Sequence, residues 1–512
     1  MSTRSSRDDG FNRRDFLKGF SAAALGAGFV GSAHAARPVV APPPAKPALP
    51  EALQGFPEIH AQRGTPGFWN QVRKAFPLPR DYIHMNTGTT GSQPEFSLNN
   101  LAVYNLYKSR DPRDWQLNLA ADFPGLFPHS SSASATFNRQ TQVAKAYGAS
   151  QPEIVLSYNT TDACNLIFAG TPWKPGDRII TTHMEHPALQ GPIAWARDYH
   201  GVEVVQVEIP SNFTADITVE QVVGWFEAEL SKPLPAGAKQ YVAFSEIFYK
   251  NGVRMPVKEI CELARKKYGA YTIVDNAHGW GMLEVDCHDY GADFIAGAGH
   301  KWLCGGPGTG ILYVRNQGDN LPPFAMGNFF LYGNPFVAPS PNFGNRDWPP
   351  AARMQSRGEA NLPALFAMTD SLAFFQYVGL ADIQTQGAAL GSYLKDKIAD
   401  KWGENALWVQ KNPDPRFHTS LTSFNPFAGK DDSTQLAAMN AAMNVVLAAL
   451  AAETPKIYVR TVTWRERATD TADNRIGFRI STHAVYNSRE EIDWLFDRLV
   501  HHVNASGLPQ LS

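Results

Sequence analysis

Residues 271–310 read YTIVDNAHGWGMLEVDCHDYGADFIAGAGHKWLCGGPGTG, and this segment is the most informative part of the sequence. It contains two apolar runs, 271–275 and 294–296, and each run is followed by polar residues capable of chemistry. An acid such as Asp275 at the end of a buried strand is costly unless a cation pairs with it. A lysine such as Lys301, placed after an apolar strand, can become a neutral amine through desolvation. Ligands of parallel sheets bind beyond the carboxyl ends of the strands, so the stretch predicts a site at that edge.

Outward from this stretch, short apolar runs alternate with amphipathic stretches. This alternation predicts an α/β domain with a largely parallel sheet covered by helices. We place the large domain at residues 81–350, with a long irregular loop at 321–352, and connecting helices with a small α+β domain at 361–512. The expected strands are 154–157, 178–182, 202–207, 241–245, 271–275, 294–296, 310–314, 457–463 and 475–481. The expected helices are 187–199, 219–230, 257–268, 362–377, 383–402, 433–452 and 489–503.

Three further segments place polar residues beside these strands. Thr160 and Thr161 open a helical stretch after strand 154–157, and a helix N-terminus binds phosphate well. His186 stands in the run MEHP, where its imidazole could stack on a flat ring. Arg479 lies inside an apolar strand, where its guanidinium needs an anion such as a substrate carboxylate.

Taken singly, each of these residues has an ordinary structural explanation. Lys301 alone is typical of a solvated loop lysine, and Asp275 of a turn cap. The pair Thr160-Thr161 fits a plain helix N-cap, and His186 a capping or solvent-facing histidine. Arg479 fits a structural salt bridge. Their order along the chain, with strands between them, is what indicates a single site.

This order resembles the class V aminotransferase family of pyridoxal-phosphate (PLP) enzymes of fold type I. That group includes isopenicillin N epimerase-like proteins and an exported PLP enzyme of siderophore maturation. The resemblance extends from about Tyr82 to Leu499 and includes the closing run RISTHAVYNSREEID, residues 479–493. It implies a large domain built on a mostly parallel seven-stranded sheet, a small C-terminal α+β domain, a homodimer, and PLP as the cofactor.

The resemblance also implies how the cofactor ring would be held. Lys301 would carry PLP as a Schiff base and shuttle protons. Asp275 would bind the pyridine nitrogen, and that ion pair would make the ring an electron sink. His278 would contact the ring hydroxyl, and His186 would stack on the ring face opposite Lys301.

For the phosphate and the substrate, the resemblance implies a second group of residues. Thr160, Thr161 and His300 would hold the phosphate. Arg479 would grip the substrate carboxylate, with Asn86 near the entrance.

The chain departs from the family pattern at three places. Ala298 stands where relatives often have a serine that contacts the phosphate. Gly358-Glu359 aligns with a Gly-Thr pair that reaches the partner subunit's phosphate, and either Arg357 offsets the glutamate charge or the alignment shifts there. Tyr249 stands where an asparagine is usual. These departures concern the reaction type, not the cofactor.

We expect transamination or epimerisation of an amino acid or an amino-acid-derived metabolite, a small-molecule amino substrate. Epimerisation needs a second acid, for which Tyr249 or His183 could serve. Desulfuration needs a nucleophilic cysteine shortly before the carboxylate-binding arginine, and none occurs between Val459 and Phe478, so a desulfurase is disfavoured. A lyase is also less favoured. The alternative from another class is a binding protein that kept the fold and lost the chemistry.

The bulk composition and the N-terminus bear on partners and location. A net charge of −2 over 512 residues carries no basic excess for nucleic acid, and four scattered cysteines favour neither a metal site nor a disulfide framework. Arg13-Arg14 precede a short apolar run, 19–31, and the sequence Ala33-His34-Ala35, which together resemble a Tat signal over residues 1–35. A Pro-rich linker would follow at 36–65. We therefore expect export by the Tat machinery to the periplasm, without stable membrane insertion.

Overall fold

A seven-stranded sheet lies at the centre of the molecule. The computed structural model describes residues 53–123, 135–323, 349–355 and 357–512. Strand β8 is antiparallel to both of its neighbours, and the other neighbouring pairs are parallel. In sheet order the strands are β2 (Ile154–Ser157), β8 (Gly310–Val314), β7 (Phe294–Ala298), β6 (Tyr271–Asp275), β5 (Gln240–Ser245), β3 (Arg178–Thr182) and β4 (Glu203–Val207). The predicted fold, a large and mostly parallel seven-stranded α/β domain, is confirmed.

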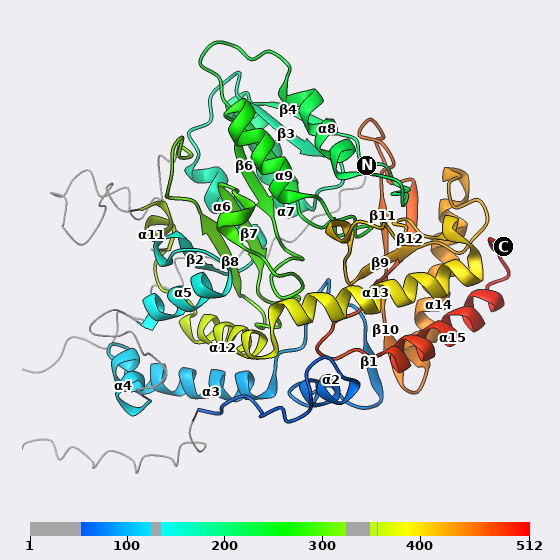
Figure 1. The fold of residues 1–512 in the computed structure, drawn as a ribbon, viewed down its shortest axis with the longest axis horizontal. Helices are drawn as coiled ribbons and strands as arrows, with labels where there is room; N and C mark the ends of the chain where they lie inside the picture. Colours follow the sequence, from blue (N-terminus) through cyan, green and yellow to red (C-terminus); the bar gives the residue numbers. More distant parts are fainter. Residues whose placement is uncertain (1–52, 124–134, 324–348, 356) are drawn as a thin grey trace, which may run out of the picture. The chain divides into compact units, whose positions relative to one another are not determined.

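Helices cover both faces of this sheet (Figure 1). Successive side chains of a strand point to opposite faces, so each strand supplies two hydrophobic cores. On β6, Ile273 enters one core and Val274 the other, and both are fully buried. The helices before residue 360 are α2 (Pro66–Arg73), α3 (Glu95–Arg110), α4 (Trp115–Asp122), α5 (Ala135–Ala146), α6 (Thr160–Gly170), α7 (Pro187–His200), α8 (Val219–Leu230), α9 (Val257–Glu262), α10 (Cys287–Tyr290) and α11 (Pro350–Gln355).

A second, antiparallel sheet forms the C-terminal part. Its order is β11 (Arg460–Trp464), β12 (Arg475–Ser481) and β9 (Leu421–Phe424). The remaining helices are α12 (Leu362–Val378), α13 (Leu380–Trp402), α14 (Leu436–Ala452) and α15 (Arg489–Ala505), and the last three share a hydrophobic core with β9 and β12. The small α+β domain expected from the sequence is therefore present.

The strand expected at 457–463 is wrong in one respect, because the structure has two strands there. Strand β10 (Lys456–Tyr458) pairs in parallel with β1 (Tyr82–His84), whereas β11 pairs with β12 in the other sheet. The chain changes sheet at Val459, and each half satisfies its backbone groups with a different partner. Local apolarity alone predicts one continuous run, since it contains no information about the partner of each residue.

Helix α14 and the turn before it, Ser433–Ala452, are long and apolar enough to span a membrane, and the bent pair α12–α13 passes the same test of composition. In the fold, one face of α14 packs against α15 and β10. Met439, Met443, Val446 and Leu450 form that buried face at helical spacing. We therefore interpret α14 as a helix of the small domain.

The segment before α2 is packed against the protein where the structure describes it. The predicted signal segment 1–35, most of the linker 36–65 and most of the loop 321–352 lie outside the described residues. In the described end of the linker, the rings of Phe56 and Tyr377 lie 4.8 Å apart, and Arg63 pairs with Asp382 at 3.1 Å. Residues 53–65 are thus held against α12 and α13.

Replacing Ile273 on β6 tests the dependence of the fold on this sheet. The side chain is fully buried, so Ile273→Ala should lower the free energy of unfolding by about 2–5 kcal/mol, measured by urea denaturation. Val445→Ala on α14 is the control, because that side chain is 65% exposed and its loss should change stability by less than about 0.5 kcal/mol. Equal effects of the two substitutions would contradict the central role of β6.

Candidate functional site

A cavity of about 350 Å³ is lined mainly by residues that follow β2, β3, β5, β6 and β7, together with residues of β11 and β12. Seven candidate site residues from the sequence line it together: Thr160, Thr161, His186, Tyr249, His300, Lys301 and Arg479. Asp275 and His278 are buried on either side of Ala277, which lines the cavity. The family resemblance implied that Asn86 lies near the entrance; in the structure Asn86 is 1% exposed, does not line the cavity, and contacts Arg479.

Lys301 is the third residue after β7 and is half-buried. Burial lowers its pKa to about 8, an effect that Asp275 opposes and Arg479 and Arg460 reinforce. Burial raises the pKa of Asp275, and the positive charge of Lys301 opposes this increase. Oδ1 of Asp275 accepts a hydrogen bond of 2.8 Å from the backbone N–H of Ala277. A substantial fraction of the lysine is thus a neutral, nucleophilic amine near physiological pH.

The N-terminus of α6 forms another part of the wall. Its N-cap is Asn159, whose Oδ1 accepts from the backbone N–H of Asp162 at 2.8 Å, so the threonines do not have the plain capping role. The hydroxyl of Thr160 and Nδ1 of His300 are buried and have no hydrogen-bond partner among the described residues. Buried polar groups without partners at a helix N-terminus indicate a site for an anion such as phosphate.

His278 is held in one tautomer by a tryptophan that the sequence reasoning did not assign a role. The indole Nε1 of Trp302 donates to Nδ1 of His278 at 3.0 Å, so the ring proton of the neutral histidine lies on Nε2. Burial, followed by the charges of Lys301 and Arg479, holds the pKa of His278 well below its usual range. Nε2 is buried without a partner in the described part of the chain, which leaves one N–H available to an acceptor.

His186 is the N-cap of α7, and its Nδ1 accepts from the backbone N–H of Ala188 at 3.1 Å. Burial lowers its pKa to about 4, so the ring is neutral. The ring meets Tyr249 edge-on, with centroids 4.7 Å apart, and both residues line the cavity. His183, the other candidate for a second acid, is fully buried and does not line the cavity.

Arg479 is 1% exposed, yet it has no acidic partner among the described residues. Nη1 donates to the backbone oxygen of Tyr249 at 2.8 Å, and Nη2 donates to Oδ1 of Asn86 at 3.0 Å and to Oγ1 of Thr89 at 2.9 Å. The structural salt bridge that the sequence left open is absent from this part of the chain. Asn86 holds the guanidinium through a neutral oxygen, so the positive charge of Arg479 is available to pair with an anionic ligand.

Arg460 is a further cavity residue, and the sequence analysis missed it. Its Nη1 donates to the same Thr89 hydroxyl at 3.1 Å. The signal was available, because Arg460 lies inside the apolar run 457–463 just as Arg479 lies inside the run 475–481. The argument made for Arg479 applied equally to Arg460.

Glu359, which aligns with the family's Gly-Thr pair, contacts a lysine away from the anion site. Glu359 is exposed and pairs with Lys108 at 2.5 Å. Arg357 pairs with Asp162 in the first turn of α6 and lies over the ring of Tyr158, 4.7 Å from its centroid. Arg357, not Glu359, is therefore the residue of this segment beside the anion site.

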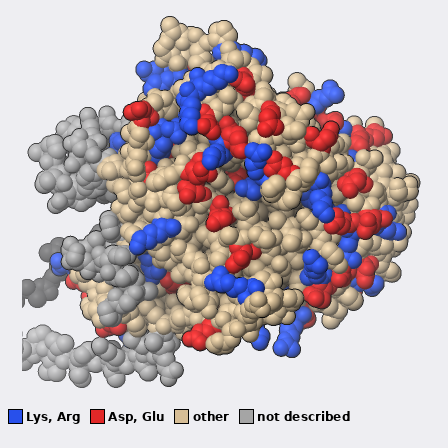
Figure 2. Space-filling view, viewed as in Figure 1, with Lys and Arg blue, Asp and Glu red and all other residues tan. Residues whose placement is uncertain are grey.

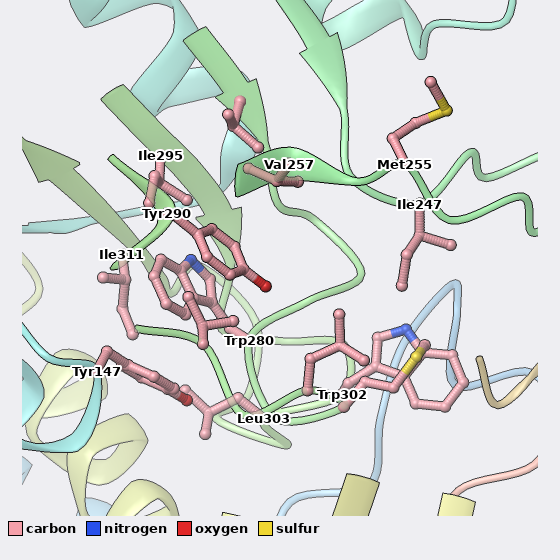
Figure 3. Close-up of a cluster of buried hydrophobic side chains, with 14 of the residues drawn as sticks. Tyr147, Ile247, Met255, Val257, Trp280, Tyr290, Ile295, Trp302, Leu303 and Ile311 are labelled. Atoms are coloured by element: carbon pink, nitrogen blue, oxygen red, sulfur yellow. The ribbon is translucent and has the colours of Figure 1, made fainter. Parts of the chain in front are cut away.

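Two loops carry the central residues of the site, and these loops pack closely against each other. The loop after β6 contains Trp280, the loop after Lys301 contains Trp302 and Leu303, and all three enter one hydrophobic cluster (Figure 3). Gly281 has φ +87°, and a Cβ there would lie 2.5 Å from the backbone of Leu303. Only glycine allows this approach, so backbone contact sets the spacing between the two loops.

Comparison with protein families gives one match that spans most of the chain. A model of the family described as Aminotransferase class-V matches residues 128–495. Among curated proteins, isopenicillin N epimerase of Streptomyces clavuligerus is 24% identical over 346 residues, which cover 66% of this chain and 80% of the epimerase. A cysteine desulfurase of Haloferax volcanii is 25% identical over 389 residues, 73% of this chain and 81% of the desulfurase.

Solved structures show the same fold. The apo cysteine desulfurase from Thermococcus onnurineus superimposes with a TM-score of 0.63 at 22% identity, covering 88% of this chain and all of that chain.

Replacing Trp302 by phenylalanine tests the tautomer of His278. In wild-type apoprotein labelled with ¹⁵N-histidine, NMR should report a neutral ring with the proton on Nε2 between pH 5 and pH 8. Trp302→Phe should mix the two tautomers and lower the free energy of unfolding by about 1–3 kcal/mol, because buried Nδ1 loses its donor. Trp195→Phe is the control, because Trp195 is 39% exposed; it should change neither the tautomer of His278 nor the free energy of unfolding. An unchanged tautomer in Trp302→Phe would contradict the assignment.

Proposed function

Because the chain belongs to the aminotransferase class-V family, we propose that it performs amino-group chemistry at Cα of an amino acid or an amino-acid-derived metabolite. The chain is a PLP-dependent enzyme of that class. One observation carries the proposal. Lys301, an amine whose pKa lies near 8, shares a cavity with Arg479, whose guanidinium has no acidic partner among the described residues.

Pyridoxal phosphate is the cofactor, and the residues present fit it. Its phosphate needs donors, which the hydroxyl of Thr160 and the ring of His300 offer as buried atoms without partners. Its ring hydroxyl needs a donor, which Nε2–H of His278 supplies. Asp275 would hold the ring nitrogen, His186 a ring face, and Lys301 the aldehyde carbon. When bound, the cofactor supplies an electron sink for negative charge at Cα.

Arg479 and Lys301 position the substrate and transfer its proton. Arg479 binds the substrate carboxylate through its guanidinium and thereby places the amino group near Lys301. Lys301 acts as the base that removes the Cα proton and returns it elsewhere. The cavity walls exclude water from the amine, which keeps its pKa low.

Transamination is the reaction that this arrangement favours, because it needs one base. Epimerisation needs an acid on the other face, and the hydroxyl of Tyr249, whose ring meets His186 in the cavity wall, is the candidate for it. Burial raises the pKa of Tyr249, so its hydroxyl stays protonated near neutral pH and has a proton to donate. Epimerisation with Tyr249 as that donor is the second candidate.

Desulfuration through a cysteine nucleophile is disfavoured. Cys164, Cys261, Cys287 and Cys304 are all of the chain's cysteines, each is fully buried, and burial raises the pKa of every thiol. A thiol kept protonated and away from substrate is unreactive. A purely binding protein is also disfavoured, since binding alone requires no amine with a depressed pKa.

Substitution of Lys301 tests the assignment. Borohydride treatment of wild-type holoenzyme should leave a pyridoxyl group on the peptide that contains Lys301, as read by mass spectrometry. Lys301→Ala should lose this adduct, and its turnover with amino acids should fall by about 10²–10⁴-fold or more. Lys266→Ala, an exposed lysine paired with Glu262, is the control and should keep both.

The products of the wild-type reaction separate the alternatives. Transamination yields a 2-oxo acid and removes the cofactor's visible absorbance on mixing, whereas epimerisation yields the other enantiomer, resolved by chiral chromatography. Tyr249→Phe should leave the first reaction within about threefold and abolish the second. No spectral change with a broad panel of amino acids would favour the binding protein.

We also propose export to the periplasm by the twin-arginine route. The support is the order of Arg13-Arg14, the apolar run 19–31 and Ala33-His34-Ala35. Cell fractionation and N-terminal sequencing should find a processed periplasmic protein that begins near residue 36. Arg13→Lys with Arg14→Lys should retain the full-length chain in the cytoplasm. A wild-type protein that is unprocessed and cytoplasmic would rule the proposal out.

A further inference from the structure

Arg460 and Arg479 lie directly opposite each other on the antiparallel strands β11 and β12. Like charges in this position destabilise a sheet unless something neutralises them. Neither guanidinium forms an ion pair with an acid in the part of the chain that the structure describes. Arg460 is half-buried and Arg479 fully buried, so solvent screens their repulsion only in part.

Both arginines face the same cavity and share one neutral acceptor. Each donates to Oγ1 of Thr89, Arg479 at 2.9 Å and Arg460 at 3.1 Å. The other contacts of Arg479 are also neutral oxygens, and its Nε is buried without a partner among the described residues. Burial and the nearby charge of Arg460 lower the pKa of Arg479 to about 9.

The surrounding residues do not neutralise the pair. The loop between β11 and β12 contains three acids: Glu466 pairs with Arg475, Asp470 accepts from Asn474 Nδ2 at 2.7 Å, and Asp473 accepts from Thr463 Oγ1 at 2.5 Å. The charge of Asp473 acts on Lys250, a third cation that is itself 6% exposed. The face of the protein shown in Figure 2 has interspersed acidic and basic side chains.

One carboxylate on Arg479 would leave the charge of Arg460 uncompensated. We propose that the substrate carries a second carboxylate, as an amino dicarboxylic acid does, and that Arg460 holds this distal group. The inference rests on the proposed function, in which Arg479 binds the carboxylate next to Cα. Arg460 is then the specificity-determining residue, since it contacts substrate away from the reacting atoms.

Binding of simple acids to the holoenzyme tests the inference without turnover. Glutarate and pentanoate have five carbons each and no amino group, and they differ in the second carboxylate. By isothermal titration, wild type should bind glutarate about 10–100-fold more tightly than pentanoate, the range expected of a charge-assisted contact. Arg460→Met should reduce glutarate binding to the level of pentanoate while leaving pentanoate within about threefold.

Arg467→Met is the matched control, because it removes the same charge from an exposed position in the loop between β11 and β12. It should keep the preference for glutarate. Retained cofactor absorbance and an unchanged melting temperature show that each variant is folded. Equal binding of the two acids by wild type would overturn the inference. An equal loss of both acids in Arg460→Met would also overturn it, since the two arginines would then share one carboxylate.

Turnover of glutamate and of norvaline, its counterpart without the second carboxylate, separates this inference from the proposed function. If neither these two nor any other amino acid of the panel reacts but the glutarate preference depends on Arg460, the second carboxylate site stands and the proposed function fails. If both react at equal rates, the proposed function stands and the inference fails. Faster turnover of glutamate, lost in Arg460→Met, supports both.

Discussion

Trp302 donates its indole N–H to His278, and this buried hydrogen bond joins the two loops on which the site depends. One loop follows Asp275 and the other contains Lys301, so the acid and the amine come from different strands, β6 and β7. Backbone contact between Gly281 and Leu303 sets their spacing, and both loops place side chains in the same hydrophobic cluster. The sheet positions the two strand ends, but the packing below the loops makes them one site.

Burial determines which ionisable side chains around the cavity carry a charge. Burial lowers the pKa values of His186, His278 and His300, so the three rings are neutral and act as donors, acceptors or flat surfaces. Among the described residues that line the cavity, positive charge is therefore confined to Lys301, Arg460 and Arg479, and Asp275 is a buried acid that interacts with Lys301. Such separation lets one small cavity hold a phosphate, a ring and a carboxylate at different positions.

Much of the fold could be predicted from the sequence because the central strands are buried on both faces. Continuous apolar runs such as 271–275 and 310–314 match β6 and β8 in the structure at both ends. The short strands β1 and β9 could not be predicted, since pairing with distant partners, not local pattern, defines them. The same limit explains why the contact between Asn86 and Arg479 could not be predicted. The two residues lie 393 residues apart in sequence.

That distance has a consequence for how the protein folds. Strand β1 pairs with β10, and Asn86 and Thr89 hold Arg479 on β12, so the arginine side of the cavity is assembled from both ends of the described chain. Contacts of such long sequence separation form late and slowly. A chain still on the ribosome has its lysine loop but lacks the arginine strands until synthesis is nearly complete. The two arginines are therefore the last residues of the cavity lining to be synthesised.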